Sequence, residues 1–275
     1  MKPKLILIDL DGTLLDDAKQ VTPASLSALK RAAAGGAEVV VATGRFYGGV
    51  PRCLLELPFL RYFILMNGAK GYDRNRDKVL FQNEIEMKTA QAVFDLLMPM
   101  HMAVDCYQND KGLMDRRYYD RLDHYIRDPE SLRLIWPNRT SLDDFRAVVQ
   151  AGGETVQKIQ CFFPDLVLRP AVMELLAREF PQLELSVSMP ANLDINQAGA
   201  TKGEALLALC RELSIDPAET AAFGDGTNDL TMLRWAGTGV AMANAAPEVL
   251  AAADLVAPSN REDGVAQVLN GWFGI

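Results

Sequence analysis

The stretch Lys4-Leu5-Ile6-Leu7-Ile8-Asp9-Leu10-Asp11-Gly12-Thr13 decides the fold. Lys4 to Leu10 is a short, mostly apolar run, which is typical of a buried strand. Asp9 and Asp11 are two residues apart, so on extended backbone their carboxylates point the same way. Such close like charges are costly unless a cation neutralises them or one of them is protonated. Oxygen ligands suit magnesium and a carboxylate can act as a nucleophile, although a turn with a helix cap is the simpler alternative.

Strand and helix signals alternate after this stretch. A helix is predicted to begin at Thr22-Pro23, with Thr as N-cap and Pro at the first helical position, and to end at Gly35-Gly36. The segments Glu38 to Ala42 and Phe63 to Met66 read as buried strands, and Tyr72 to Phe81 reads as a hairpin. Strand, helix, strand in this order predicts the α/β class, with a Rossmann-like parallel sheet.

The same rhythm returns near the end of the chain. Thr201 to Glu204 fits a capping box that opens a helix. Short strands are expected at Thr220 to Phe223, Val240 to Met242 and Leu255 to Val256. Between these two parts of the chain with alternating strands and helices, the composition differs. This difference predicts an inserted α+β domain over residues 83–189. The core is then expected to comprise residues 1–82 and 190–275, in keeping with a chain of 275 residues.

Composition and charge exclude several classes of protein. With 28 basic and 36 acidic residues the formal net charge is −8, which argues against nucleic-acid binding. No apolar run approaches the ~20 residues that span a membrane, and Asp9 and Asp11 would be out of place in a signal peptide. Four scattered cysteines and 2 histidines show no metal-type spacing. We therefore expect a cytoplasmic protein that binds neither nucleic acid nor membrane; its oligomeric state leaves no readable signal.

Three further polar clusters are expected at strand ends, where open parallel α/β sheets bind ligands. Thr43-Gly44-Arg45 could hold a phosphoryl oxygen, but taken alone this signal is weak and a simple turn explains it better. Lys202 lies in the first turn of its helix, against the preference for anions there, which suggests an anion or carboxylate partner unless it is merely exposed. Gly224-Asp225-Gly226-Thr227-Asn228-Asp229 suits a metal-binding turn, with an Asx-type turn as the alternative.

These four clusters, in this order, resemble the four motifs of the haloacid-dehalogenase-like superfamily. Asp9 to Thr13 matches the first motif, Thr43 the second, Lys202 the third and Gly224 to Asp229 the fourth. The insert resembles the type II-B cap of the Cof-type phosphatases in length and position. Three further segments also look like that group: Met66-Asn67-Gly68-Ala69, Ala241-Met242-Ala243-Asn244-Ala245 and Glu262-Asp263-Gly264-Val265-Ala266.

The resemblance implies a role for each matching position. Asp9 would be the nucleophile that becomes an aspartyl phosphate, and Asp11 would be the general acid and then the base. Mg²⁺ would be held by Asp9, by Asp225 and by the backbone carbonyl of Asp11. Asp229 would act directly or through water. The phosphoryl oxygens would be held by Thr43, Gly44, Lys202, Asn228 and the Leu10 amide. The metal and Lys202 would offset the repulsion between a carboxylate and a phosphate.

Substrate contacts are less clearly marked. Arg45 and Asn67 lie at core strand ends and are candidates. In the cap, Arg116, Arg117, Arg121 and His124 could contact an anionic substrate, but their spacing equally fits a solvated helix face.

The resemblance implies a Mg²⁺-dependent phosphatase of small phosphorylated metabolites, with sugar phosphates ahead of flavin or pyridoxal phosphates. A phosphomannomutase-like mutase, or a binding module with a vestigial site, are the alternatives.

Overall fold

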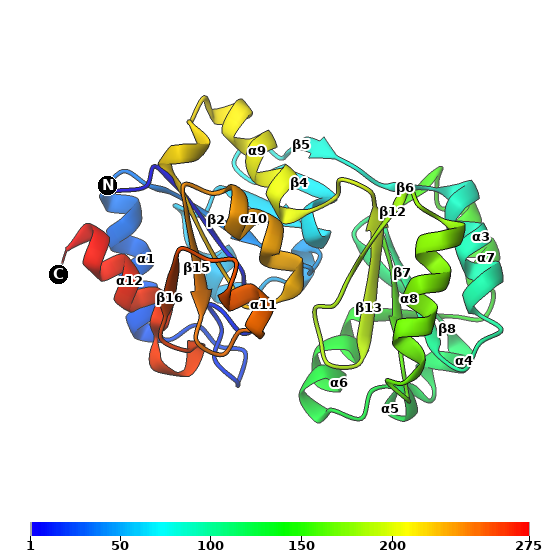
Figure 1. Ribbon diagram of the computed structural model, residues 1–275. Coiled ribbons are helices and arrows are strands. Elements are labelled where there is room, and N and C mark those ends of the chain that lie inside the picture. The colour runs from blue at the N-terminus through cyan, green and yellow to red at the C-terminus, as the bar shows by residue number, and fades with distance from the viewer. Residues whose placement is uncertain (1, 275) are drawn as a thin grey trace. The chain divides into compact units, whose positions relative to one another are not determined.

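The computed structural model describes residues 2–274 and shows two compact units. One unit comprises the residues up to Gln82 and from Thr201 on, and the other comprises Asn83–Ala200. The predicted return to the core at residue 190 is too early, because β13 (Asn192–Gln197) pairs with β11 (Lys158–Phe162) inside the second unit. A strand that is committed to the cap sheet cannot belong to the core. Figure 1 shows the elements of both units.

The first unit is built on a sheet with the order β16-β15-β14-β1-β2-β3-β4-β5. Its strands are β1 (Leu5–Ile8), β2 (Glu38–Ala42), β3 (Tyr62–Leu65), β4 (Lys70–Asp73), β5 (Lys78–Gln82), β14 (Thr220–Gly224), β15 (Thr238–Met242) and β16 (Leu255–Ala257). The pairs from β16 to β3 are parallel, and β4 and β5 add the expected antiparallel hairpin. The predicted α/β class with a parallel core sheet is confirmed.

Helices cover both faces of this sheet (Figure 1). They are α1 (Pro23–Ala34), α2 (Arg52–Leu55), α9 (Lys202–Leu213), α10 (Leu230–Trp235), α11 (Pro247–Leu250) and α12 (Gly264–Phe273). Leu5 and Leu7 of β1 pack in one apolar cluster with Leu206 and Leu209 of α9. The other face receives α12, whose Trp272 ring lies 5.5 Å from that of Phe223 in β14. Both faces of the central strands are therefore dry, which explains their unbroken apolar runs.

Local sequence signals place two of these helices. Thr22 caps α1 by accepting a hydrogen bond from the Ser25 amide at 3.1 Å, Pro23 is its first residue and Gly35 its C-cap, as predicted. Thr201 caps α9 by accepting a hydrogen bond from the Glu204 amide at 3.2 Å. Since α9 begins at this cap, the position of Lys202 in its first turn is fixed by sequence chemistry.

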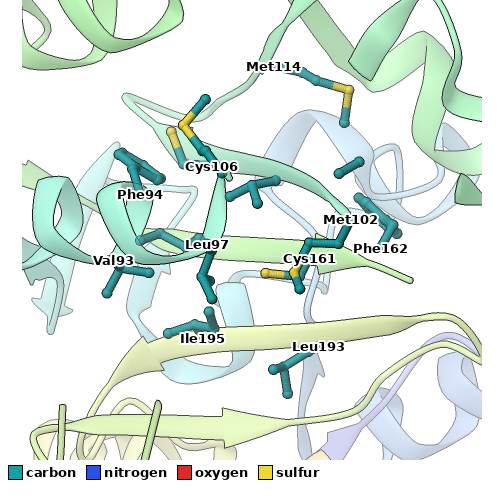
Figure 2. Packing of buried hydrophobic residues seen from close by; sticks show 14 of the residues in the cluster. Val93, Phe94, Leu97, Met102, Cys106, Met114, Cys161, Phe162, Leu193 and Ile195 are labelled. Carbon is teal, nitrogen blue, oxygen red and sulfur yellow. The ribbon is translucent and has the colours of Figure 1, made fainter. Parts of the chain in front are cut away.

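The second unit is an α+β domain with a sheet of order β12-β13-β11-β7-β8-β9. Its further strands are β7 (Ala103–Gln108), β8 (Lys111–Asp115), β9 (Arg139–Leu142) and β12 (Leu183–Ser186), and β6 (Ile85–Glu86) pairs separately with β10 (Thr155–Val156). Its helices are α3 (Met87–Leu97), α4 (Arg116–Tyr119), α5 (Leu122–Tyr125), α6 (Pro129–Ile135), α7 (Phe145–Ala151) and α8 (Leu168–Glu179). Figure 2 shows Phe94, Cys106, Cys161 and Ile195 within its apolar core.

Among residues 2–274, no helix has the length and apolar content needed to cross a bilayer. The four cysteines are all unpaired thiols, and three of them are buried.

Candidate active site

The centre of the site is a buried ammonium group between two carboxylates. The Nζ atom of Lys202 donates hydrogen bonds to Oδ1 of Asp9 at 2.5 Å and to Oδ1 of Asp229 at 2.6 Å. Lys202 is 0% exposed, so it is no solvated surface lysine. The prediction of a carboxylate partner for Lys202 is confirmed, and these two partners offset the unfavourable helix dipole at the start of α9.

Burial shifts the protonation equilibria of this cluster. It raises the pKa of Asp9 well above its usual range, and the charges of Asp229 and Asp225 raise it further, against the attraction of Lys202. Burial and the Asp229 charge raise the pKa of Asp225 to about 7. Burial alone would lower the pKa of Lys202, but the carboxylates of Asp229 and Asp9 outweigh it and raise that pKa. Lys202 therefore stays charged, but its single positive charge is too little to neutralise the carboxylates of Asp9, Asp225 and Asp229.

Three carboxylates in this cluster could share a cation. One oxygen from each of Asp9, Asp225 and Asp229 lies within 4.8 Å of the other two. A set of oxygen donors suits a hard divalent cation, and two unneutralised negative charges remain when all three are ionised beside Lys202. Both oxygens of Asp229 already have partners, because Oδ2 accepts the amides of Asp225 at 3.0 Å and Gly226 at 2.9 Å. Asp9 and Asp225 are thus better placed than Asp229 to hold a metal directly.

The loops after β1 and β14 touch each other through Gly12, Thr13 and Asp225. Thr13 donates a hydrogen bond from Oγ1 to Oδ1 of Asp225 at 2.7 Å. Gly12 has a φ of +87°, and a Cβ there would lie 2.2 Å from Oδ2 of Asp225. Only glycine fits such a conformation at this approach. Thr13 holds the Asp225 side chain, a contact that the sequence analysis missed.

Asp11 has partners of its own. Arg45 donates to it twice, from Nε to Oδ2 at 2.7 Å and from NH2 to Oδ1 at 2.6 Å, and the ammonium group of Lys19 lies 3.2 Å from Oδ1. Burial opposes ionisation of Asp11, but the hydrogen bonds and charges of Arg45 and Lys19 outweigh it and lower its pKa. Asp9 and Asp11 therefore have different partners: Asp9 contacts Lys202, and Asp11 contacts Arg45.

The segment after β2 forms a second wall of the site. Thr43 is buried, its amide donates to the Ile64 carbonyl at 2.9 Å, and its Oγ1 accepts the Arg45 amide at 3.2 Å. Gly44 lies so close to Asn67 that a Cβ on it would be 2.8 Å from Asn67 Oδ1. The structure thus brings Thr43, Gly44, Arg45 and Asn67 together, although Arg45 engages Asp11 rather than facing open solvent.

Asn67 lies in a strained turn that joins three loops. Met66, Asn67 and Gly68 all have positive φ, at 51°, 62° and 112°. The backbone amide of Asn67 donates a hydrogen bond to the Thr43 carbonyl at 3.1 Å. Its side-chain Oδ1 accepts a hydrogen bond from Nδ2 of Asn228, also at 3.1 Å. A Cβ at Gly68 would lie 2.3 Å from the Thr201 carbonyl oxygen, so the turn also abuts the start of α9. Consecutive left-handed residues are costly and persist where their surroundings hold them.

Leu10 and two asparagines complete the loop after β1. The Leu10 side chain is buried, and its carbonyl accepts the amides of Thr13 at 3.3 Å and Leu15 at 2.9 Å. Asn244 donates to the Gly12 carbonyl, and Asn260 donates to the Leu15 carbonyl, both at 2.8 Å. The two asparagines thus hold the loop through hydrogen bonds to its backbone. The segment around Asn244 was noted only as part of a resemblance, and Asn260 gave no signal.

Comparison with known proteins places this geometry in a family. Residues 6–269 match the model of the haloacid dehalogenase-like hydrolases. The chain belongs to the haloacid dehalogenase-like hydrolase family. The resemblance read from the motifs is thereby confirmed, and the enzyme class is that of a phosphoric monoester hydrolase.

Relatives cover the whole chain of this hydrolase. The putative phosphatase YxeH of Bacillus subtilis is 34% identical over 97% of each chain. The pyridoxal phosphate phosphatase YbhA of Escherichia coli is 29% identical over 98% of each. The structure of a haloacid dehalogenase-like hydrolase from B. subtilis matches with a TM-score of 0.85 and 29% identity, covering 97% of this chain and 99% of that one.

The cap candidates of the hydrolase lie on the short helices of the second unit. Arg116 is exposed and pairs with Asp143 there. Arg117 pairs with Asp115 at 3.3 Å, and Arg121 is exposed next to α5. The His124 ring packs edge-on against those of His101 and Tyr125 at 5.5 and 5.0 Å. Each of these contacts lies within the second unit, so a role in substrate binding stays a prediction.

Proposed function

We propose that this hydrolase is a Mg²⁺-dependent phosphatase of small phosphorylated metabolites that works through an aspartyl phosphate on Asp9. The observation that carries the proposal is the buried contact of Asp9 with Lys202 beside Asp225 and Asp229. Sugar phosphates are the first substrate class to expect, followed by flavin-type and pyridoxal phosphates. The relative that is named a pyridoxal phosphate phosphatase supports the small-metabolite class.

Asp9 and Asp225 would hold the metal, together with the carbonyl of Asp11. Asp229 would act through water, since its two oxygens already bind Lys202 and the amides of Asp225 and Gly226. When bound, Mg²⁺ supplies positive charge that offsets the repulsion between a carboxylate and a phosphate dianion. Gly12 and Thr13 keep the Asp225 side chain in place for this task.

In the first step, a carboxylate oxygen of Asp9 attacks phosphorus and the bond from phosphorus to the leaving oxygen breaks. Asp11 gives a proton to that oxygen, so that an alcohol departs. Lys202, the Thr43 hydroxyl, the Asn228 amide and the backbone amides of Leu10 and Gly44 would hold the phosphoryl oxygens. Phosphoryl transfer depends mainly on such alignment and charge stabilisation.

In the second step, Asp11 takes a proton from water, whose oxygen attacks phosphorus and displaces Asp9. Inorganic phosphate leaves and both aspartates return to their starting forms. Arg45 and Lys19 favour ionised Asp11, the form that this step requires. Acting as an acid in the first step requires Asp11 to bind a proton, so the approach of the substrate must weaken this ion pair.

The deciding experiment measures phosphate release from a panel of phosphorylated metabolites, with Mg²⁺ and with chelator. Asp9→Asn is compared with the parent, and Asp123→Asn, at an exposed cap position, is the matched control. We expect activity that chelation and Asp9→Asn abolish and that Asp123→Asn retains. A folded parent that releases no phosphate from the whole panel would refute the proposal; isomerised sugar phosphates without free phosphate would indicate a mutase.

A further inference from the structure

Two cations face one carboxylate at the outer part of the site. Asp11, Arg45 and Lys19 have side chains that are 24%, 12% and 33% exposed, so this group reaches solvent while Lys202 does not. Arg45 donates hydrogen bonds from Nε and Nη2 to the Asp11 carboxylate. Its Nη1 donates to the Gly49 carbonyl at 2.8 Å. Arg45 is thus fixed by three hydrogen bonds and positions the Asp11 carboxylate.

The backbone presents Lys19 to Asp11 in a defined turn. Lys19 has a φ of 58°, a left-handed conformation that non-glycine residues adopt at a cost. Its amide donates to the Asp16 carbonyl at 3.0 Å, and the Asp16 amide donates to the Gln20 carbonyl at 3.0 Å. The Gln20 amide also donates to Oδ1 of Asp16 at 2.8 Å. These bonds hold the backbone of the turn, and the contact with Asp11 at 3.2 Å orients the Lys19 side chain.

Lys19 forms no ion pair with the acids of its own turn. Its one ion pair among residues 2–274 is with Asp11, which Arg45 already neutralises. Of the acids next to it in the turn, Asp16 accepts the Gln20 amide and Asp17 pairs with Arg261 at 2.7 Å. An ammonium group has three donors, and one of them reaches Asp11. The group of Asp11, Arg45 and Lys19 therefore carries one net positive charge, and Lys19 keeps donors to spare at a partly exposed position.

We propose that Lys19 binds an anionic group on the leaving part of the substrate, so that the preferred substrates are phosphate monoesters whose alcohol carries a second negative charge. The inference rests on the proposed function, in which Asp11 protonates the leaving oxygen. A cation in contact with Asp11 then lies on the side of the leaving group. The anionic group is a carboxylate or a second phosphate, since both accept hydrogen bonds from an ammonium group.

The test compares sugar phosphates that carry a second anionic group with one that does not. 6-Phosphogluconate and glucose 1,6-bisphosphate are each compared with glucose 6-phosphate, for a carboxylate and a phosphate respectively. The enzymes are the parent, Lys19→Met, Lys19→Arg and Lys19→Asn; asparagine is neutral yet tolerates the left-handed conformation. It therefore keeps the test valid if methionine disturbs the turn.

The parent is expected to show a higher kcat/KM for at least one of the charged substrates than for glucose 6-phosphate. Lys19→Met and Lys19→Asn are expected to lower kcat/KM about fivefold more for that charged substrate than for glucose 6-phosphate, a typical effect of one partly exposed ion pair. Any change in the pKa of Asp11 would affect both substrates alike, so the ratio of the two kcat/KM values reports on the anionic group. Lys19→Arg is expected to restore the preference. Added salt is expected to weaken the preference of the parent.

The failures of the two proposals look different. Equal hydrolysis of charged and neutral substrates by the parent, or an equal loss on both in Lys19→Met and Lys19→Asn, overturns the role of Lys19 and leaves the phosphatase proposal standing. A folded parent that releases phosphate from neither these probes nor the wider panel in Mg²⁺ overturns both.

Discussion

The side chain of Asn228 donates a hydrogen bond to the side chain of Asn67 at 3.1 Å, although 161 positions separate them in the chain. Asn67 is held at a φ of 62° and bonds through its amide to the Thr43 carbonyl. The pair therefore links the loop after β14 to the segment after β2. Asn67 acts in this way as a positioning residue for Asn228, in addition to its place near the predicted phosphoryl site.

Two substitutions at Asn67 distinguish the role of its side chain from that of its backbone conformation. Asn67→Gly keeps the left-handed turn and loses the acceptor, and we expect kcat/KM to fall about tenfold, the loss of roughly 1.4 kcal/mol. Asn67→Ala also strains the turn and should cost stability as well. Combining Asn67→Gly with Asn228→Ala in a double-mutant cycle should give a loss well below the sum of the single losses. Fully additive losses in kcat/KM would show that the two side chains act independently.

Lys202 balances two buried carboxylates. Lys202→Met leaves Asp9 and Asp229 without their cation, so we expect the free energy of unfolding of the metal-free protein to fall by about 3–5 kcal/mol. Phosphate release should fall by about 10³-fold, because the charge opposite the phosphoryl group is lost. Urea unfolding and phosphate assays measure the two effects, with Lys30→Met at an exposed position of α1 as control. A variant with parental stability would contradict the ion-pair cluster.

Metal binding should depend on pH. Because the pKa of Asp225 is raised to about 7 and that of Asp9 is also raised, both groups must release protons when a cation binds. We expect the Mg²⁺ affinity, measured by calorimetry, to weaken on going below pH 7, by about tenfold per pH unit for each proton released. Asp225→Asn should lose most of this affinity. An affinity that stays constant between pH 6 and 8 would show that neither carboxylate takes part.

In the metal-free protein, the raised pKa of Asp225 makes stability fall as the pH rises, whereas Mg²⁺ affinity increases with pH. A carboxyl group whose pKa is raised by folding binds protons more tightly in the folded state. Its contribution to stability is present below the unfolded pKa and is lost as the pH rises through the folded value of about 7. In chelator, the midpoint of thermal unfolding should fall from pH 5 to pH 8, and saturating Mg²⁺ should reverse the fall. Asp225→Asn should show a smaller fall.

The hairpin of β4 and β5 provides a pH effect away from the site. Arg61 donates to Asp73 twice, at 2.9 and 2.6 Å, and these hydrogen bonds outweigh burial and lower the pKa of Asp73. The stabilisation is present above the unfolded pKa of about 3.9 and is lost as the pH falls below it. Asp73→Asn should cost about 1.5–3 kcal/mol at pH 7 by urea unfolding and flatten the acid limb, with unchanged kcat/KM. An unchanged acid limb would rule out this pair as its source.

Strong local signals allowed the core to be predicted from the sequence. The apolar strand before Asp9, the Thr22-Pro23 start of α1 and the Thr201 cap of α9 each reflect chemistry within a few residues. The carboxylate partners of Lys202 could be anticipated as a class, because a cation in the first turn of a helix needs a reason. Which carboxylates they are depends on long-range pairing, which one sequence does not encode locally.

Other features had no local signal. Lys19 resembles any exposed lysine in a polar turn, and its contact with Asp11 arises only when the turn folds back. The end of the cap was placed too early because nothing local in β13 reveals that it pairs with β11 of the cap sheet. Both misses concern groups whose partners lie in other segments of the chain.

The position of β1 in the sheet has a consequence for synthesis on the ribosome. β1 pairs with β2 on one side and with β14 on the other, and all four of its residues are buried. The strand that closes its second edge, β14, begins only at Thr220. One edge of β1, with its unpaired backbone N–H and C=O groups, thus stays open while the whole inserted unit is translated, and open strand edges invite pairing with other chains. The newly made chain must protect this edge until the residues from Thr220 on emerge.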